Sequence, residues 1–116
     1  MPHDAPALLE DVRQAARLIL DFVTGRSLLE YTKDALLHSA VERQFIIIGE
    51  ALSRLEKLDA SLTNQVSNYR QIIGFRNVLV HGYQAIDDQI VWQVIELDLP
   101  VLKQQVENIL SGFGPP

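Results

Sequence analysis

Three side chains suited to phosphate chemistry lie within the eight residues 76–83, RNVLVHGY. They are Arg76, His81 and Tyr83, with Asn77 next to the arginine. A neutral imidazole can take the proton from a ribose 2′-hydroxyl as that oxygen attacks the adjacent phosphorus. A guanidinium can hold two phosphate oxygens and stabilise the charge that develops in the transition state. One chemistry that this run could support is therefore metal-free cleavage of RNA.

The geometry of a helix limits how these side chains can meet. At about 100° per residue, Arg76 and Tyr83 lie nearly in line, and Asn77 and His81 stack one turn apart. Arg76 and His81 are about 140° apart on an ideal helix, so they converge only if the helix ends or bends between them. Gly82 favours a helix end there. Asn77 could orient the imidazole or bind a phosphate oxygen.

The motif supplies one histidine per chain, whereas cleavage works best with both a base and an acid. A twofold dimer that brings two such histidines together is the economical solution. Spacing alone, however, favours a simpler interpretation, in which an exposed arginine and a capping histidine mark the end of a helix.

Four amphipathic segments position this run. They cover about 6–24, 36–57, 62–80 and 89–110, and none of them alternates with the period of a strand. The predicted core residues are Leu8, Val12, Ala15, Ala16, Ile19 and Val23 in the first, Val41, Phe45, Ile48, Leu52 and Leu55 in the second, and Val66, Tyr69, Ile73 and Val80 in the third.

The ends of these segments carry capping signals. Asp4 can cap the first helix and Gly25 can end it, and Ser27 with Glu30 matches a capping box that opens a short helix or the second long one. Asp87 or Asp88 caps the fourth segment, and Pro100 should kink or interrupt it because proline removes a backbone donor. We expect an all-α, antiparallel up-and-down bundle of four to five helices, one domain over 1–116 with a frayed tail at 112–116.

Composition excludes several classes of protein. The 116 residues include no cysteine, which excludes disulfides and thiolate chemistry, and no apolar stretch is long enough to span a membrane. The three histidines share no metal-binding spacing, so we expect neither a metal site nor a cofactor. The first residues lack the pattern of a secretory signal, and the simplest location is the cytoplasm.

The net charge of −5 argues against nucleic-acid binding, but its distribution weakens that argument. Residues 60–86 contain no Asp or Glu, and they include Arg70, Arg76 and His81. A locally basic strip on an acidic body could take a phosphodiester. Equally, a partly buried segment would avoid acidic residues for structural reasons.

The run Arg76, His81, Gly82, Tyr83 resembles the RX4HXY signature of HepT-like HEPN proteins at every position, and Asn77 matches the polar residue common after that arginine. Residues 41–52, VERQFIIIGEAL, are similar to the second-helix pattern of these proteins, and the resemblance continues through 72–75 and 90–92. It covers most of the chain.

The resemblance implies a toxin ribonuclease of a HEPN–nucleotidyltransferase pair. Such proteins dimerise around a composite cleft, some assemble further, and their partner is a minimal nucleotidyltransferase antitoxin. The resemblance implies that Arg76 and His81 are catalytic, that Asn77 assists them, and that Tyr83 accepts AMP. Glu50 is a further candidate, because a carboxylate in an apolar helix stretch needs a partner, which Arg76 or Arg43 could provide.

Two other classes remain open. One is a non-catalytic helical module that binds a nucleotidyltransferase and serves as its substrate. The other is a plain oligomerising bundle whose motif caps a helix. A neighbouring reading frame for a small nucleotidyltransferase would favour the ribonuclease toxin or the nucleotidyltransferase-binding module over the plain bundle.

Overall fold

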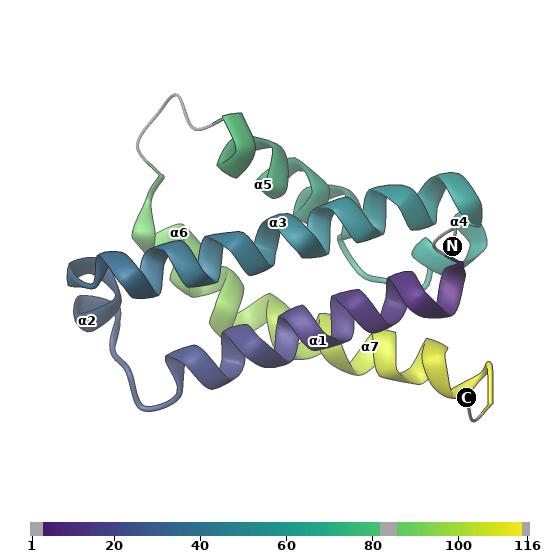
Figure 1. Cartoon of the computed structure of the whole chain (residues 1–116), viewed down its shortest axis with the longest axis horizontal. Helices are drawn as coiled ribbons and strands as arrows, with labels where there is room; N and C mark the ends of the chain where they lie inside the picture. Colours follow the sequence, from purple (N-terminus) through teal and green to yellow (C-terminus); the bar gives the residue numbers. More distant parts are fainter. Residues whose placement is uncertain (1–3, 82–85, 115–116) are drawn as a thin grey trace.

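Helices form every regular element of the computed structural model, which describes residues 4–81 and 86–114 (Figure 1). They are α1 (Ala5–Val23), α2 (Leu28–Lys33), α3 (Ala35–Leu58), α4 (Ala60–Thr63), α5 (Tyr69–His81), α6 (Asp88–Gln93), the π-helical η1 (Val94–Asp98) and α7 (Leu99–Ser111). The predicted all-α, antiparallel bundle is confirmed.

The long helix α3 is the centre of the bundle. It packs against α1 and α5, with α1 on one side and α5 on the other (Figure 1), and α7 packs on α1. The predicted core residues of α1 and α3 are buried, except that Val23 is half-buried. Burial of apolar area at about 25 cal/mol per Å² is the main stabilising term for such a bundle.

The predicted caps form at the predicted places. Asp4 accepts a hydrogen bond from the backbone N–H of Ala7 at 2.9 Å, and Gly25 follows α1 with a φ of +76°. Ser27 and Glu30 form the capping box, and it opens the separate short helix α2. Asp87 caps α6 by accepting a hydrogen bond from Gln89 N–H at 2.9 Å.

The third predicted helix is two helices. Residues 64–68 separate α4 from α5, and Asn68 has a φ of +60° there. Asn and Ser favour turns because their side chains compete for the backbone, and Asn tolerates the left-handed conformation. Tyr69, Ile72 and Leu79 form the buried side of α5, and Ile73 is half-buried. Val80, predicted to lie in the core, is 46% exposed, and that prediction was wrong.

Pro100 interrupts the fourth segment as expected, through a π-helical turn. It lies in the first turn of α7, where a missing N–H costs least. The preceding turn widens to η1, with Leu99 N–H bonding to the carbonyl of Val94 five residues earlier. Such π turns relieve local conflicts in a helix.

None of the helices among residues 4–81 and 86–114 is long and apolar enough to cross a membrane. Residues 115–116 of the predicted frayed tail lie outside the described ranges, and the extent of that tail stays a prediction.

Candidate functional site

Arg76 leaves α5 where this helix packs tightly on α3 at Gly49. A Cβ atom added to Gly49 of α3 would lie 2.2 Å from the Cβ and 2.5 Å from the Cγ of Arg76. The aliphatic stem of Arg76 therefore crosses directly over the Gly49 backbone. Phe45 and Phe75 pack edge-to-face one turn away, with ring centroids 5.1 Å apart. These contacts fix how far Arg76 extends across α3.

The guanidinium of Arg76 is held between two acceptors. Its Nη1 donates to Asn77 Oδ1 at 2.7 Å, and its Nη2 lies 3.5 Å from Glu50 Oε1. Of the two partners proposed for Glu50, the structure therefore places Arg76 there. The Arg76 side chain stays 27% exposed, so an anion can reach the outer nitrogens. Its Nε is buried and has no hydrogen-bond partner among the described residues.

His81 is the last residue of α5, and its side chain is exposed. The helix is continuous from Tyr69 to His81, so it does not end between Arg76 and His81. On such a helix the two side chains leave the axis about 140° apart. The expected helix end falls after His81, too late to bring the pair together in one chain. Tyr83 lies outside the described residues.

Arg70, the other arginine of residues 60–86, also contacts α3. Arg70 Nε donates to the Tyr69 hydroxyl at 3.1 Å, and that hydroxyl donates to Glu56 Oε2 at 2.7 Å. The hydrogen bond to Tyr69 and the charge of Glu56 raise the pKa of Arg70. Each of these two arginines therefore has a carboxylate partner on α3, Glu50 for Arg76 and Glu56 for Arg70.

A second polar cluster lies where α6 meets α2 and α3. The Tyr31 ring is fully buried, 4.5 Å from His38 and 5.5 Å from Trp92 between centroids. His38 Nε2 lies 3.2 Å from Asp88 Oδ1, an ion-pair distance whose direction is not that of a hydrogen bond. Burial raises the pKa of Glu42; nearby His38 lowers it and Asp88 raises it. The cluster holds the start of α6, just beyond the motif.

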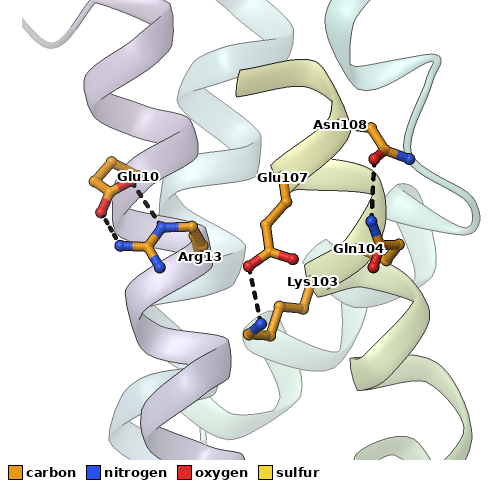
Figure 2. A network of polar contacts seen from close by, with 6 residues as sticks. All are labelled: Glu10, Arg13, Lys103, Gln104, Glu107 and Asn108. Atoms are coloured by element: carbon orange, nitrogen blue, oxygen red, sulfur yellow. Dashed lines mark hydrogen bonds and ion pairs between the residues drawn. The ribbon is translucent and has the colours of Figure 1, made fainter. Parts of the chain in front are cut away.

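A hollow lies at the α1–α7 contact and includes no residue of α5. Its volume is about 890 Å³. Figure 2 shows the polar side chains beside it: Glu10 binds Arg13 on α1, and Lys103 binds Glu107 at 2.9 Å on α7. Each charge there has a partner on its own helix. No group of three or more metal-ligating side chains occurs in the ranges 4–81 and 86–114.

Sequence reasoning did not single out Gly49, although the glycine lies in the quoted α3 pattern. An isolated glycine inside a long helix costs about 1 kcal/mol relative to alanine, which is a signal of close packing at that position. The partner of this glycine, Arg76, could not be read from sequence, because it depends on how α5 docks.

The helical bundle and the Arg76, His81, Tyr83 run together define a HEPN-type protein. A family model described as ribonuclease HepT-like matches residues 12–109, and the chain belongs to this HepT-like ribonuclease family.

Individual relatives cover nearly the whole chain. A candidate RNase of Caldanaerobacter subterraneus subsp. tengcongensis is 33% identical over 103 residues, which is 89% of this chain and 91% of that protein. A candidate RNase of Methanocaldococcus jannaschii is 31% identical over 107 residues, 92% of this chain and 97% of that protein. A candidate ribonuclease HepT of Thermococcus cleftensis is 29% identical over 101 residues, 87% and 91% of the two chains. No solved structure gives a significant match.

Proposed function

We propose that this protein is an endoribonuclease toxin that cleaves RNA, tRNA or mRNA, at a composite site of a homodimer. The observation that carries the proposal is Arg76, held across α3 by Gly49 and Glu50 yet still open to an anion, on the helix that ends in His81. Membership of the HepT-like ribonuclease family supports RNA as the substrate.

In the proposed reaction His81 takes the proton of a ribose 2′-hydroxyl. The 2′-oxygen bonds to phosphorus, the bond to the 5′-oxygen breaks, and the leaving oxygen takes a proton from the second histidine. Arg76 stabilises the charge on the phosphoryl oxygens, and Asn77 holds the guanidinium in place. The products are a 2′,3′-cyclic phosphate and a 5′-hydroxyl. Because the motif residues supply base, acid and cation, no divalent metal is needed.

The dimer is part of this proposal for two reasons. The continuous helix keeps Arg76 and His81 of one chain about 140° apart, so a second copy is needed to bring an arginine and two histidines around one phosphate. The fourth segment also exposes Ile90, Leu97 and Val101, and α5 exposes Val78, apolar side chains that a second copy would cover. Assembly beyond the dimer is compatible with the same surfaces.

Regulation by a cognate nucleotidyltransferase antitoxin, which adds AMP to Tyr83, completes the proposal. The chain has three tyrosines, and the other two are poor acceptors: Tyr31 is fully buried and the Tyr69 hydroxyl is bonded to Glu56. AMP on Tyr83 would add bulk and negative charge to the motif and compete with the substrate phosphate for the guanidinium of Arg76. Tyr83→Phe should remain an active nuclease that the partner cannot silence. An adduct on another residue, found by mass spectrometry after incubation with the partner and ATP, would contradict this regulation.

The central test is incubation of the purified protein with total RNA in a chelator. The wild type should cleave, and His81→Ala and Arg76→Ala should not, while His3→Ala, a substitution outside the motif, should cleave at the wild-type rate. The 3′ ends should be 2′,3′-cyclic phosphates. Activity that disappears in chelator and returns with magnesium would overturn the mechanism.

A further inference from the structure

One row of α3 carries a concentration of positive charge outside the Arg76 motif. Arg43, Ile47, Glu50, Arg54 and Lys57 follow each other at intervals of four, three, four and three residues. At about 100° per residue they fall within about 40° of one line along the helix. This line is opposite the buried face of α3, and the three cations are exposed.

The cations of this row have no counter-charge of their own. In the described part of the chain, only four Lys and Arg residues form no ion pair: Lys33, Arg43, Arg54 and Lys57. Three of these four lie on the row. Its one acid, Glu50, lies 3.5 Å from Arg76, so that pair is neutral overall. On a chain with a net charge of −5, this grouping stands out.

The row also passes the proposed active site. Arg43 lies on one side of the Glu50–Arg76 pair, and Arg54 and Lys57 lie on the other. From Arg43 to Lys57 the row spans about 21 Å at 1.5 Å per residue, long enough for several nucleotides of an extended strand. In Figure 1, α3 lies between α1 and α5, and the exposure of Arg43, Arg54 and Lys57 shows that neither helix covers these three side chains.

A shallow hollow lies at the Lys57 end of the row. It has a volume of about 430 Å³ and is lined by Leu8, Arg54, Lys57 and Leu58. Leu58 is 54% exposed. The exposed side chain of Leu58 offers an apolar surface for a base, and the two cations beside it can bind phosphate, as the charged grooves that follow single strands do.

We propose that Arg43, Arg54 and Lys57, here called the α3 track, bind the phosphate backbone of single-stranded RNA on both sides of the bond held by Arg76. The hollow at Leu58 receives one nucleotide of that strand. This inference rests on the proposed function, because it assigns subsites for the same substrate. A second copy is a poor occupant, since twofold contact across the track would bring like charges together.

The test measures binding of a fluorescent oligouridine by anisotropy over a range of salt concentrations. The variant Arg43→Gln/Arg54→Gln/Lys57→Gln removes the track. Each lost phosphate contact lowers the slope of log K against log salt by about 0.7, so the variant should lose about 2 units of slope. Its Kd should rise at least about tenfold at low salt. The matched control Arg17→Gln/Arg26→Gln/Lys33→Gln removes the same charge from α1, from α2 and from the turn between them, and should keep the wild-type slope.

Cleavage assays separate this inference from the proposed function. A dinucleoside phosphate is too short to reach the track, so the track variant should cleave it at the wild-type kcat and cleave long RNA with a raised KM. If neither the wild type nor the variants cleave RNA, the nuclease proposal fails. The salt dependence of oligouridine binding still tests whether the α3 track binds RNA.

Three results would overturn the track. The first is a track variant that binds oligouridine as the control does. The second is a track variant that no longer binds the nucleotidyltransferase but still binds RNA, which would assign the surface to the protein partner. The third is a changed oligomer mass, which would assign it to a contact between copies.

Discussion

Gly49 and Arg76 occupy the same contact between α3 and α5, and only a residue without a side chain fits opposite the arginine. The Cβ atoms would be 2.2 Å apart, a distance that requires the backbones to separate. Because the near neighbours are Cβ and Cγ, the first atoms of the arginine side chain, a change of rotamer cannot relieve the clash. The glycine therefore sets the separation of the two helices and the reach of the guanidinium toward Glu50.

We predict that Gly49→Ala displaces α5. Overpacking of this kind typically costs about 1–3 kcal/mol of stability. Cleavage should fall by more than the unfolded fraction explains, because Arg76 moves relative to the phosphate. Urea unfolding gives the stability, and RNA cleavage under conditions where both proteins are folded gives the activity.

Gly74→Ala is the matched control for that experiment. Gly74 lies on α5 with nothing within 4 Å of an added Cβ, so alanine should stabilise the helix by about 0.5–1 kcal/mol. Its cleavage activity should match the wild type. Equal effects of the two substitutions would show that the Gly49 contact has no special role.

The sequence predicted the helices and most of the core because apolar periodicity is a local property. The predicted core residues of α1 and α3 are all buried or half-buried. The prediction for the third segment was wrong at Val80, because the buried side of α5 follows Tyr69, Ile72 and Leu79, and Val80 points about 100° away from Leu79. Apolar spacing does not show on which side of a helix its neighbour packs.

The candidate site was predicted by resemblance more than by spacing. The contact of Arg76 with Glu50 followed from the need of a carboxylate for a partner, yet sequence could not choose between Arg76 and Arg43. That choice depends on docking of α5 on α3, which is a long-range property. The α3 track could not be recognised from charge along the sequence, because its cations are separated by other residues in the sequence and line up only on one side of the helix.

Glu50→Gln should separate RNA binding from cleavage. The substitution removes the negative charge beside Arg76, so the Kd for RNA should fall, while the guanidinium loses an anchor and kcat should fall several-fold. The pair is partly exposed, and its loss should change stability by less than about 1 kcal/mol. Glu56→Gln makes the same charge change at the Tyr69 contact and should leave kcat unaltered. A wild-type kcat for the Glu50→Gln enzyme would show that Glu50 does not position Arg76 for cleavage.

Glu42 should make stability depend on pH in an unusual direction. Burial raises the pKa of this carboxyl in the folded state. The stabilisation by its proton is fully present below the unfolded pKa and is lost as pH rises through the folded pKa. Glu42→Gln, which cannot ionise, should therefore gain stability relative to the wild type on going from about pH 4 to pH 7.

Asp34→Asn should change the pH dependence of stability in the opposite direction. Hydrogen bonds from Leu37 N–H and Arg26 lower the pKa of Asp34, so its stabilisation is present above the unfolded pKa and lost in acid. This variant should lose stability relative to the wild type as pH rises from about pH 2 to about pH 5, the range in which the carboxyl ionises. Urea unfolding across the two ranges checks the two variants, and a Glu42→Gln protein that also loses stability relative to the wild type as pH rises would refute the assignment for Glu42.

The homodimer is tested by placing a charge on the exposed apolar face of the fourth segment. Leu97 is 69% exposed there, and a glutamate buried at a contact between copies would be an unpaired charge. We expect Leu97→Glu to weaken dimerisation at least about tenfold, or about 1.4 kcal/mol, and to lower cleavage in proportion to the dimer lost. Leu36→Glu, at a residue 81% exposed on α3, should stay dimeric and active. Light scattering gives the masses. A wild type that is monomeric at micromolar concentration, or a monomeric Leu97→Glu protein with full activity, would refute the composite site.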